Sequence, residues 1–114
     1  MDRSEERVVD PHTGGEKATK LARYDLIPPK ALWQIAEVYG KGAQKYDDNN
    51  WRKGYKWSLS YAAMLRHIQL FWMGEDIDPE TGCPHVAMAG WHCLTLLTFA
   101  DEHPELDDRW AGLQ

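Results

Sequence analysis

One short segment of the chain carries several carboxylates that could hold a cation. Within six positions it contains Glu75, Asp76, Asp78 and Glu80. Hard divalent cations take several oxygen ligands, which a flexible loop can supply. An EF-hand is excluded, because Gly82 falls at the seventh position counted from Asp76 and Ala87 occupies the twelfth. The segment therefore fits either a cation-binding loop or a solvated turn before a helix, where acidic residues favour the helix dipole.

As a metal site, this loop would use Glu75 and Asp78. The repulsion between crowded carboxylates then predicts a raised pKa for one of them when no metal is bound. Glu37 is a candidate third ligand, but it also fits an ordinary surface ion pair with Lys41, four residues further along a helix.

Three histidines are candidates for metal ligation or proton transfer. His67 lies at the edge of an apolar helical stripe, and His85 lies in the first turn of the next predicted helix. His92 follows seven residues later, which places its Cα atom roughly 10 Å from that of His85 on a helix. That spacing is awkward for one shared ion, so His85 beside the acidic loop is the better ligand or proton carrier. Each histidine also fits a core position with a hydrogen bond to the backbone.

Basic and aromatic residues supply what a triphosphate needs. Arginine forks and lysine point charges both bind phosphate, and an aromatic ring can stack on a base. The candidates for nucleotide contact are Arg23, Lys45, Trp51, Arg52 and Arg66.

Composition limits the class of protein. The chain has 114 residues, enough for one domain with a modest core, and a formal net charge of -5. The negative charge argues against duplex nucleic acid as the main partner. There is no apolar run of the ~20 residues that a membrane span needs, and no signal peptide at the start. Two cysteines without an export signal fit a reducing cytoplasm.

The apolar spacing predicts three helices, over residues 30–46, 58–73 and 84–100, with Ser58 as the N-cap of the second. Residues 1–13 are expected to be flexible, residues 14–23 to form a basic arm and residues 24–29 to be extended before two prolines. The third helix is apolar on most sides, which predicts burial in a bundle or at an interface between copies. These features predict one all-α domain over residues 1–114, a bundle of three main helices with an extended N-terminal arm, completed by oligomerisation. Residues 101–114 would form an acidic tail.

Three sequence patterns together resemble one known family. They are the run from Lys20 to Pro29, the run from Gly42 to Tyr46 followed by Asn50, Trp51 and Gly54, and the run from Arg66 and His67 through Glu75, Asp78 and Gly82 to His85. In order and spacing they resemble the dATP/dGTP diphosphohydrolase N-terminal domain family, which is MazZ-like and common in phages. The similarity covers residues 15–100. Met88 departs from the family pattern, which often has a polar residue there. The chain lacks the His-Asp pair of HD phosphohydrolases and the Glu-Glu-x-x-Glu motif of MazG enzymes.

The resemblance implies an all-α, metal-dependent pyrophosphatase that converts dGTP or dATP to the monophosphate and diphosphate, by attack of a metal-activated water on the α-phosphorus. In such an enzyme Glu75, Asp78 and Glu37 would hold Mg²⁺ or Mn²⁺, and His67 and His85 would be ligands or proton carriers. Lys45, Arg52 and Arg66 would bind phosphates, and Trp51 would stack on the base. Asn50, which matches the family pattern, would be a further nucleotide contact. The alternatives are a phage protein that sequesters nucleotides or cyclic nucleotides without turnover, and a structural module whose tryptophans anchor an interface.

Overall fold

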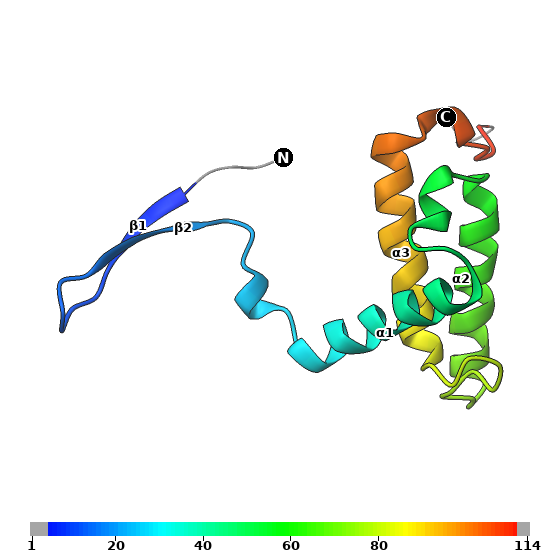
Figure 1. Ribbon diagram of the computed structural model, residues 1–114, viewed down its shortest axis with the longest axis horizontal. Helices are drawn as coiled ribbons and strands as arrows, with labels where there is room; N and C mark the ends of the chain where they lie inside the picture. The colour runs from blue at the N-terminus through cyan, green and yellow to red at the C-terminus, as the bar shows by residue number, and fades with distance from the viewer. Residues whose placement is uncertain (1–4, 112–114) are drawn as a thin grey trace.

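The computed structural model describes residues 5–111, which fold into three helices and a separate hairpin (Figure 1). The helices are α1 (Pro29–Lys45), α2 (Trp57–Trp72) and α3 (His85–Glu102). Short 3₁₀ turns, η1 (Tyr24–Leu26), η2 (Asn50–Lys53) and η3 (Pro104–Leu106), lie between or after them. The expected three helices are confirmed, with boundaries within two residues of those predicted. Residues 1–4 of the segment expected to be flexible and residues 112–114 of the expected acidic tail lie outside the described residues.

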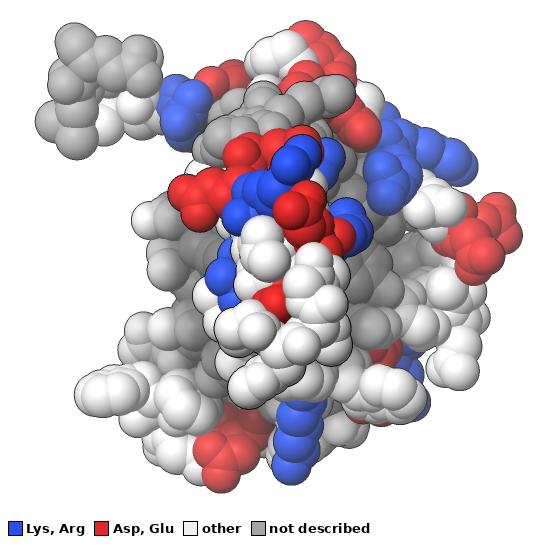
Figure 2. Space-filling model, turned by 90° about the vertical axis from the view of Figure 1, so that its left-hand side faces the viewer, with Lys and Arg blue, Asp and Glu red and all other residues white. Residues whose placement is uncertain are grey.

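The all-α prediction is wrong in one respect, because the N-terminal arm contains a two-stranded antiparallel sheet. Strand β1 (Glu5–Val9) pairs with β2 (Glu16–Lys20), in a register that places Arg7 opposite Ala18. Two cross-strand ion pairs, Arg7–Glu16 at 3.3 Å and Lys20–Glu5 at 3.6 Å, support the hairpin. Figure 2 views the molecule from this side and shows acidic and basic side chains intermixed. Sequence periodicity missed the strands because both faces of the hairpin are largely exposed, so no apolar alternation marks them.

The segment before α1 also differs from the expected extended chain. Tyr24, Asp25 and Leu26 form the turn η1, and only Ile27 and Pro28 are extended, with ψ angles of 128° and 117°. Each proline restrains its own predecessor alone, so residues further upstream remained free to turn.

Helices α2 and α3 pack side by side, and α1 crosses against α3 (Figure 1). Val38 of α1 is buried with Cys83 and Ala87, and Ile35 packs at the edge of this cluster. Gly90 permits the close approach, since a Cβ atom there would lie 2.9 Å from Cδ1 of Ile35. α3 is buried where α1 and α2 pack against it, and Phe99 is fully enclosed, whereas Leu97 is 71% exposed.

The expected N-cap at Ser58 is wrong, because α2 begins one residue earlier, at Trp57, with Lys56 as its N-cap. The backbone amide of Ser58 instead donates to Asp108 Oδ1 at 2.9 Å, and the Ser58 hydroxyl donates to Asp108 Oδ2. The indole of Trp57 donates to the carbonyl of His103 at 3.1 Å. Residues after α3 therefore satisfy the first turn of α2, which local sequence could not show. No helix in the described part of the chain is long and apolar enough to cross a membrane.

Candidate functional site

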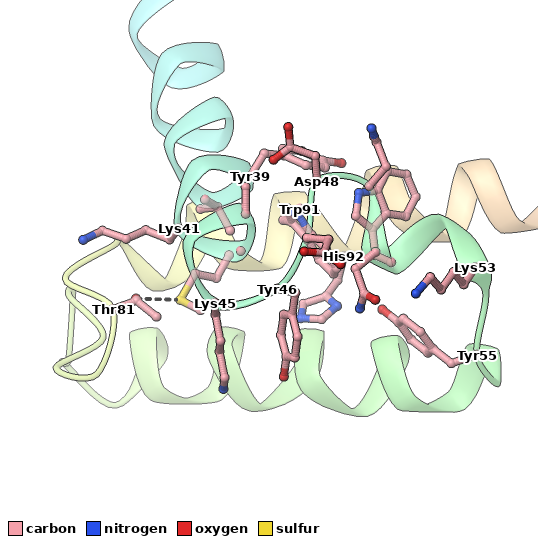
Figure 3. A pocket seen from close by; sticks show the side chains of 18 of the residues that line it. Tyr39, Lys41, Lys45, Tyr46, Asp48, Lys53, Tyr55, Thr81, Trp91 and His92 are labelled. Carbon is pink, nitrogen blue, oxygen red and sulfur yellow. Dashed lines mark hydrogen bonds between the residues drawn. The ribbon is translucent and has the colours of Figure 1, made fainter.

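An open cavity of about 790 Å³ lies where α1, the connector after it, and α3 meet (Figure 3). Its volume is in the range of small-molecule sites. Its lining combines aromatic rings, three lysines and several amide and carboxyl groups. The lining side chains include those of Tyr39, Lys41, Lys45, Tyr46, Asp47, Asp48, Asn49, Asn50, Trp51, Lys53, Tyr55, Thr81, Cys83, Met88, Trp91 and His92.

The connector is shaped so that Trp51 reaches this cavity. Asn49 takes a left-handed conformation with φ of 60°, which starts the turn η2, and Gly54 ends it with φ of 93°. A Cβ atom at Gly54 would lie 2.7 Å from Leu106 Cδ1. The Trp51 ring then packs against Tyr39 and Trp91, with ring centroids 5.9 and 6.0 Å apart. The result is an aromatic wall built from three elements that are distant in sequence.

The sequence candidates for nucleotide contact divide into two groups. Lys45, Asn50 and Trp51 all line the cavity. Arg52 lies beside it, with its guanidinium 4.8 Å from the Trp51 ring centre and 3.9 Å from a Glu102 carboxylate oxygen.

The other two arginines lie elsewhere. Arg23 is on the arm, where two hydrogen bonds of 2.8 and 2.7 Å bind it to Asp25. Arg66 is exposed on α2, and its charge acts on His67 and His92.

His67 and His85 form a hydrogen-bonded chain with Glu75. His85 is fully buried, its Nε2 lies 3.0 Å from Glu75 Oε2, and its Nδ1 lies 2.9 Å from Nδ1 of His67. An ionised Glu75 accepts a hydrogen bond, so His85 Nε2–H is the donor. A neutral His85 then accepts at Nδ1, and His67 donates from its own Nδ1. This arrangement leaves Nε2 of His67 as the unprotonated nitrogen at the end of the chain, able to take up a proton.

Asp78 has a structural role in the loop between α2 and α3. Its carboxylate accepts hydrogen bonds from the Thr81 hydroxyl at 2.8 Å and the Thr81 amide at 3.2 Å. Burial raises the pKa of Asp78, but hydrogen bonds from the Thr81 hydroxyl and from the backbone of Glu80 and Thr81, together with the charge of His67, hold that pKa below its ordinary value. The expected carboxylate repulsion therefore does not raise the pKa of Asp78.

The three proposed metal ligands are not grouped as a resident metal site. Glu75 is bonded to His85 and Asp78 to Thr81, while Glu37 is exposed on α1. Within residues 5–111, no three His, Cys, Asp or Glu side chains are placed to hold a metal ion together. These residues do not fit a preformed metal centre.

The sequence made His92 a weaker candidate than His85, but the structure places its ring in the lining of the cavity. Its Nδ1 lies 3.0 Å from the Ser60 hydroxyl, which in turn lies 2.5 Å from the Tyr55 hydroxyl. The His92 ring is stacked on that of His67, with centroids 6.1 Å apart. The only sequence signal for His92 was its spacing of seven residues from His85. Seven residues make about two turns of α3, so the two histidines lie on the same face of the helix.

Removing the Asp78 carboxylate should destabilise the loop. We expect Asp78→Ala to lower the free energy of unfolding by about 1 kcal/mol, because two hydrogen bonds to a part-exposed charge are lost. Thermal unfolding measures the effect, and Asp76→Ala is the matched control, since its carboxylate is exposed. If the two variants melt at the same temperature, the Thr81 bonds contribute nothing.

Acid should destabilise the fold through His92 and His67. Burial lowers the pKa of His92 to about 4, with the charges of His67 and Arg66 adding to the effect. Burial, followed by the neighbouring His85, also lowers the pKa of His67. The unfolded chain binds protons on these rings near pH 6.5, before the native state does, so the free energy of unfolding should fall as the pH drops from about 6.5 towards 4. Urea unfolding across this range tests it. In His92→Gln the fall should be shallower, and an unchanged slope would contradict the assignment.

The sequence matches the family described as dATP/dGTP diphosphohydrolase, N-terminal, over residues 11–109. The chain belongs to this family. A protein of Salmonella phage PMBT28 named "dATP/dGTP diphosphohydrolase" is 33% identical over 92 residues, which make up 80% of this chain and 31% of the phage protein. The chain thus spans about a third of the length of this relative. No solved structure matches the chain. The matched range runs from the hairpin to the residues that hold the start of α2, so it includes every element that lines the cavity.

Proposed function

We propose that this chain binds a purine deoxynucleoside triphosphate in the cavity and converts it to the monophosphate and diphosphate. The observation that carries the proposal is the joining of an aromatic wall and three lysines, Lys41, Lys45 and Lys53, in one cavity of a chain that belongs to this family. A base stacks on aromatic rings, and ammonium groups neutralise phosphates. Figure 3 shows the rings of Tyr46, Trp91 and His92 towards the middle of the cavity and the lysines at its edge.

In this reaction a water oxygen bonds to the α-phosphorus while the bond to the bridging oxygen of the diphosphate breaks. The lysines would hold the negative charge that gathers on the leaving diphosphate. His67, His85 and Glu75 do not line the cavity themselves, but the His67 ring is stacked on that of His92, which does, with centroids 6.1 Å apart. The chain His67–His85–Glu75 would take up the proton of the attacking water through Nε2 of His67, its free end. We also propose that the reaction requires Mg²⁺ or Mn²⁺ bound to the triphosphate, since hard divalent cations bind phosphate oxygens.

Incubation with each of the four dNTPs, with and without Mg²⁺ or Mn²⁺, tests this proposal. We expect dGTP or dATP to yield monophosphate and diphosphate in equal amounts, and only with a divalent ion. Lys45→Ala should weaken nucleotide binding without changing the melting temperature of the free protein, since Lys45 is exposed. Tight binding with no turnover under any metal would instead favour a nucleotide-sequestering protein.

We further propose that the chain acts as an oligomer. It exposes 9158 Å² of surface, whereas a compact monomer of its mass exposes about 6,400 Å². Its radius of gyration is 18.4 Å, against about 13 Å for a compact domain of this length. The hairpin arm, which extends away from the three helices in Figure 1, contributes to this excess of roughly 2,700 Å². The whole excess is larger than the roughly 800 Å² that one side of a standard interface buries. A second copy could cover the apolar groove of about 630 Å³ between α2, α3 and the tail, where Leu97 and Trp110 are 71% and 76% exposed.

Light scattering at micromolar concentration should therefore give the mass of a dimer or a higher oligomer. Leu97→Glu should reduce that mass, because it places a charge in the proposed interface, whereas Met73→Glu, on an exposed residue outside the groove, should not. A monomer mass for the unaltered chain would contradict the proposed assembly.

A further inference from the structure

Three side chains, Tyr55, Ser60 and His92, form a hydrogen-bonded relay that begins and ends on the cavity. Tyr55 and His92 both line it, while Ser60 between them is fully buried on α2. The Tyr55 and Ser60 hydroxyl oxygens are 2.5 Å apart, and the Ser60 oxygen is 3.0 Å from Nδ1 of His92. Nδ1 is thus engaged, which leaves Nε2 as the ring nitrogen of His92 that remains available to another partner.

A relay of two hydroxyls can run in either direction without moving a heavy atom. In one direction Tyr55 donates to Ser60, and Ser60 donates to Nδ1 of His92, so Nε2 carries the proton and is a donor. In the other direction Nδ1–H donates to Ser60, and Ser60 donates to the Tyr55 oxygen, so Nε2 is an acceptor. Both directions satisfy the buried Ser60 hydroxyl. The imidazole therefore presents a donor or an acceptor to the cavity at little cost.

We propose that His92 is a specificity-determining residue, and that its relay to Ser60 and Tyr55 lets the cavity accept both 6-oxo and 6-amino purines. This inference rests on the proposed purine nucleotide function. A 6-oxo purine offers an acceptor at that edge and a 6-amino purine offers a donor. A fixed donor at this position would face the donor of a 6-amino purine, and both groups would lack a hydrogen-bond partner. Such unpaired buried polar groups are what lets a binding site reject one of two similar ligands. A reversible relay removes this penalty for both bases.

The packing around His92 holds its ring in the one orientation that the relay needs. Trp91 meets the His92 ring edge-on at 4.7 Å, and His67 stacks on it at 6.1 Å. These contacts restrict rotation of the ring, so the exchange of donor and acceptor at Nε2 must come from the proton and not from a ring flip. Because burial keeps the ring neutral over the physiological range, both tautomers remain available there.

Tyr55→Phe separates the two directions of the relay. The substitution removes the Tyr55–Ser60 hydrogen bond in both directions, and both directions keep the bond between Ser60 and Nδ1. In the direction that makes Nε2 an acceptor, the buried Ser60 hydroxyl hydrogen is left without an acceptor. In the direction that makes Nε2 a donor, only a lone pair of the Ser60 oxygen is left unpaired, which costs less free energy. ¹⁵N NMR of the nucleotide-free protein should show the His92 nitrogen shifts moving towards the Nε2–H tautomer in Tyr55→Phe. Tyr46→Phe, which alters another cavity tyrosine whose hydroxyl lies outside the relay, should leave the shifts unchanged. Unchanged shifts in Tyr55→Phe would overturn the relay.

Nucleotide affinity then tests the role in specificity. Calorimetry with dATP and dGTP should show Tyr55→Phe weakening dATP by about three- to tenfold while dGTP changes much less, and Tyr46→Phe leaving their ratio unchanged. If the unaltered chain binds both nucleotides and Tyr55→Phe weakens them equally, the inference fails and the proposed function stands. If the unaltered chain binds no purine nucleotide, the proposed function and this role fail together, whatever the NMR result.

Discussion

Phe99→Ala should lower the free energy of unfolding by about 3–5 kcal/mol, the range for a large-to-small change at a buried aromatic residue. Phe99 is fully buried and joins three parts of the molecule. Its ring lies 5.0 Å from that of Tyr55, 6.2 Å from that of Trp51 and 5.5 Å from that of His103. A small domain has only about 5–15 kcal/mol of stability, so this single change should leave the chain close to unfolding at 37 °C.

Urea unfolding followed by circular dichroism measures this loss. Met73→Ala is the matched control, because Met73 is 73% exposed at the end of α2, and its removal should change the free energy of unfolding by less than about 0.5 kcal/mol. A similar loss in both variants would mean that Phe99 is not the centre of the core. Phe99→Leu should recover much of the stability and show that volume, not aromaticity, is what the site requires.

Trp51→Ala should weaken binding of a purine dNTP by about five- to a hundredfold, because stacking of a base on an aromatic ring contributes about 1–3 kcal/mol. Trp51 is the ring that joins Tyr39 and Trp91 in the cavity wall, and the Arg52 guanidinium lies over it. Trp51→Phe should retain most of the affinity, since a smaller ring still stacks.

Isothermal titration calorimetry with dGTP and dATP provides the measurement, and the melting temperature of each variant shows whether it remains folded. Trp33→Ala is the control, since Trp33 is 70% exposed on α1 and the cavity wall is formed by residues further along that helix. If Trp51→Ala binds as tightly as Trp33→Ala, the aromatic wall is not the base site. The cavity would then have to act through its lysines alone.

Helix positions could be predicted from the sequence because their signals are local. Pro28 and Pro29 mark the start of α1, Gly74 follows the end of α2, and Pro84 precedes α3. Apolar residues recur at helical spacing between these points. The hairpin had no such signal, since its two short strands have no buried face.

The candidate site could be predicted only in part. Lys45, Asn50 and Trp51 were identified from their types and spacing, and they line one cavity. Arg23 was grouped with them but lies on the arm, paired with Asp25. Ser60 and Tyr55 gave no signal at all, because a hydroxyl becomes informative only when its partner is known.

The sequence by itself determined the three helices, the family and the set of residue types available for nucleotide chemistry, because each depends on neighbours within a few positions along the chain. Tertiary structure decided how those residues are used. His85 is buried between Glu75 and His67, and Asp108 completes the first turn of α2. These outcomes follow from hydrogen bonds and burial between segments as far as 50 residues apart. The Asp78–Thr81 pair lies within one loop, but whether the Glu75 carboxylate is free or already bonded to His85 depends on how two helices and their connection pack, and no local pattern encodes that.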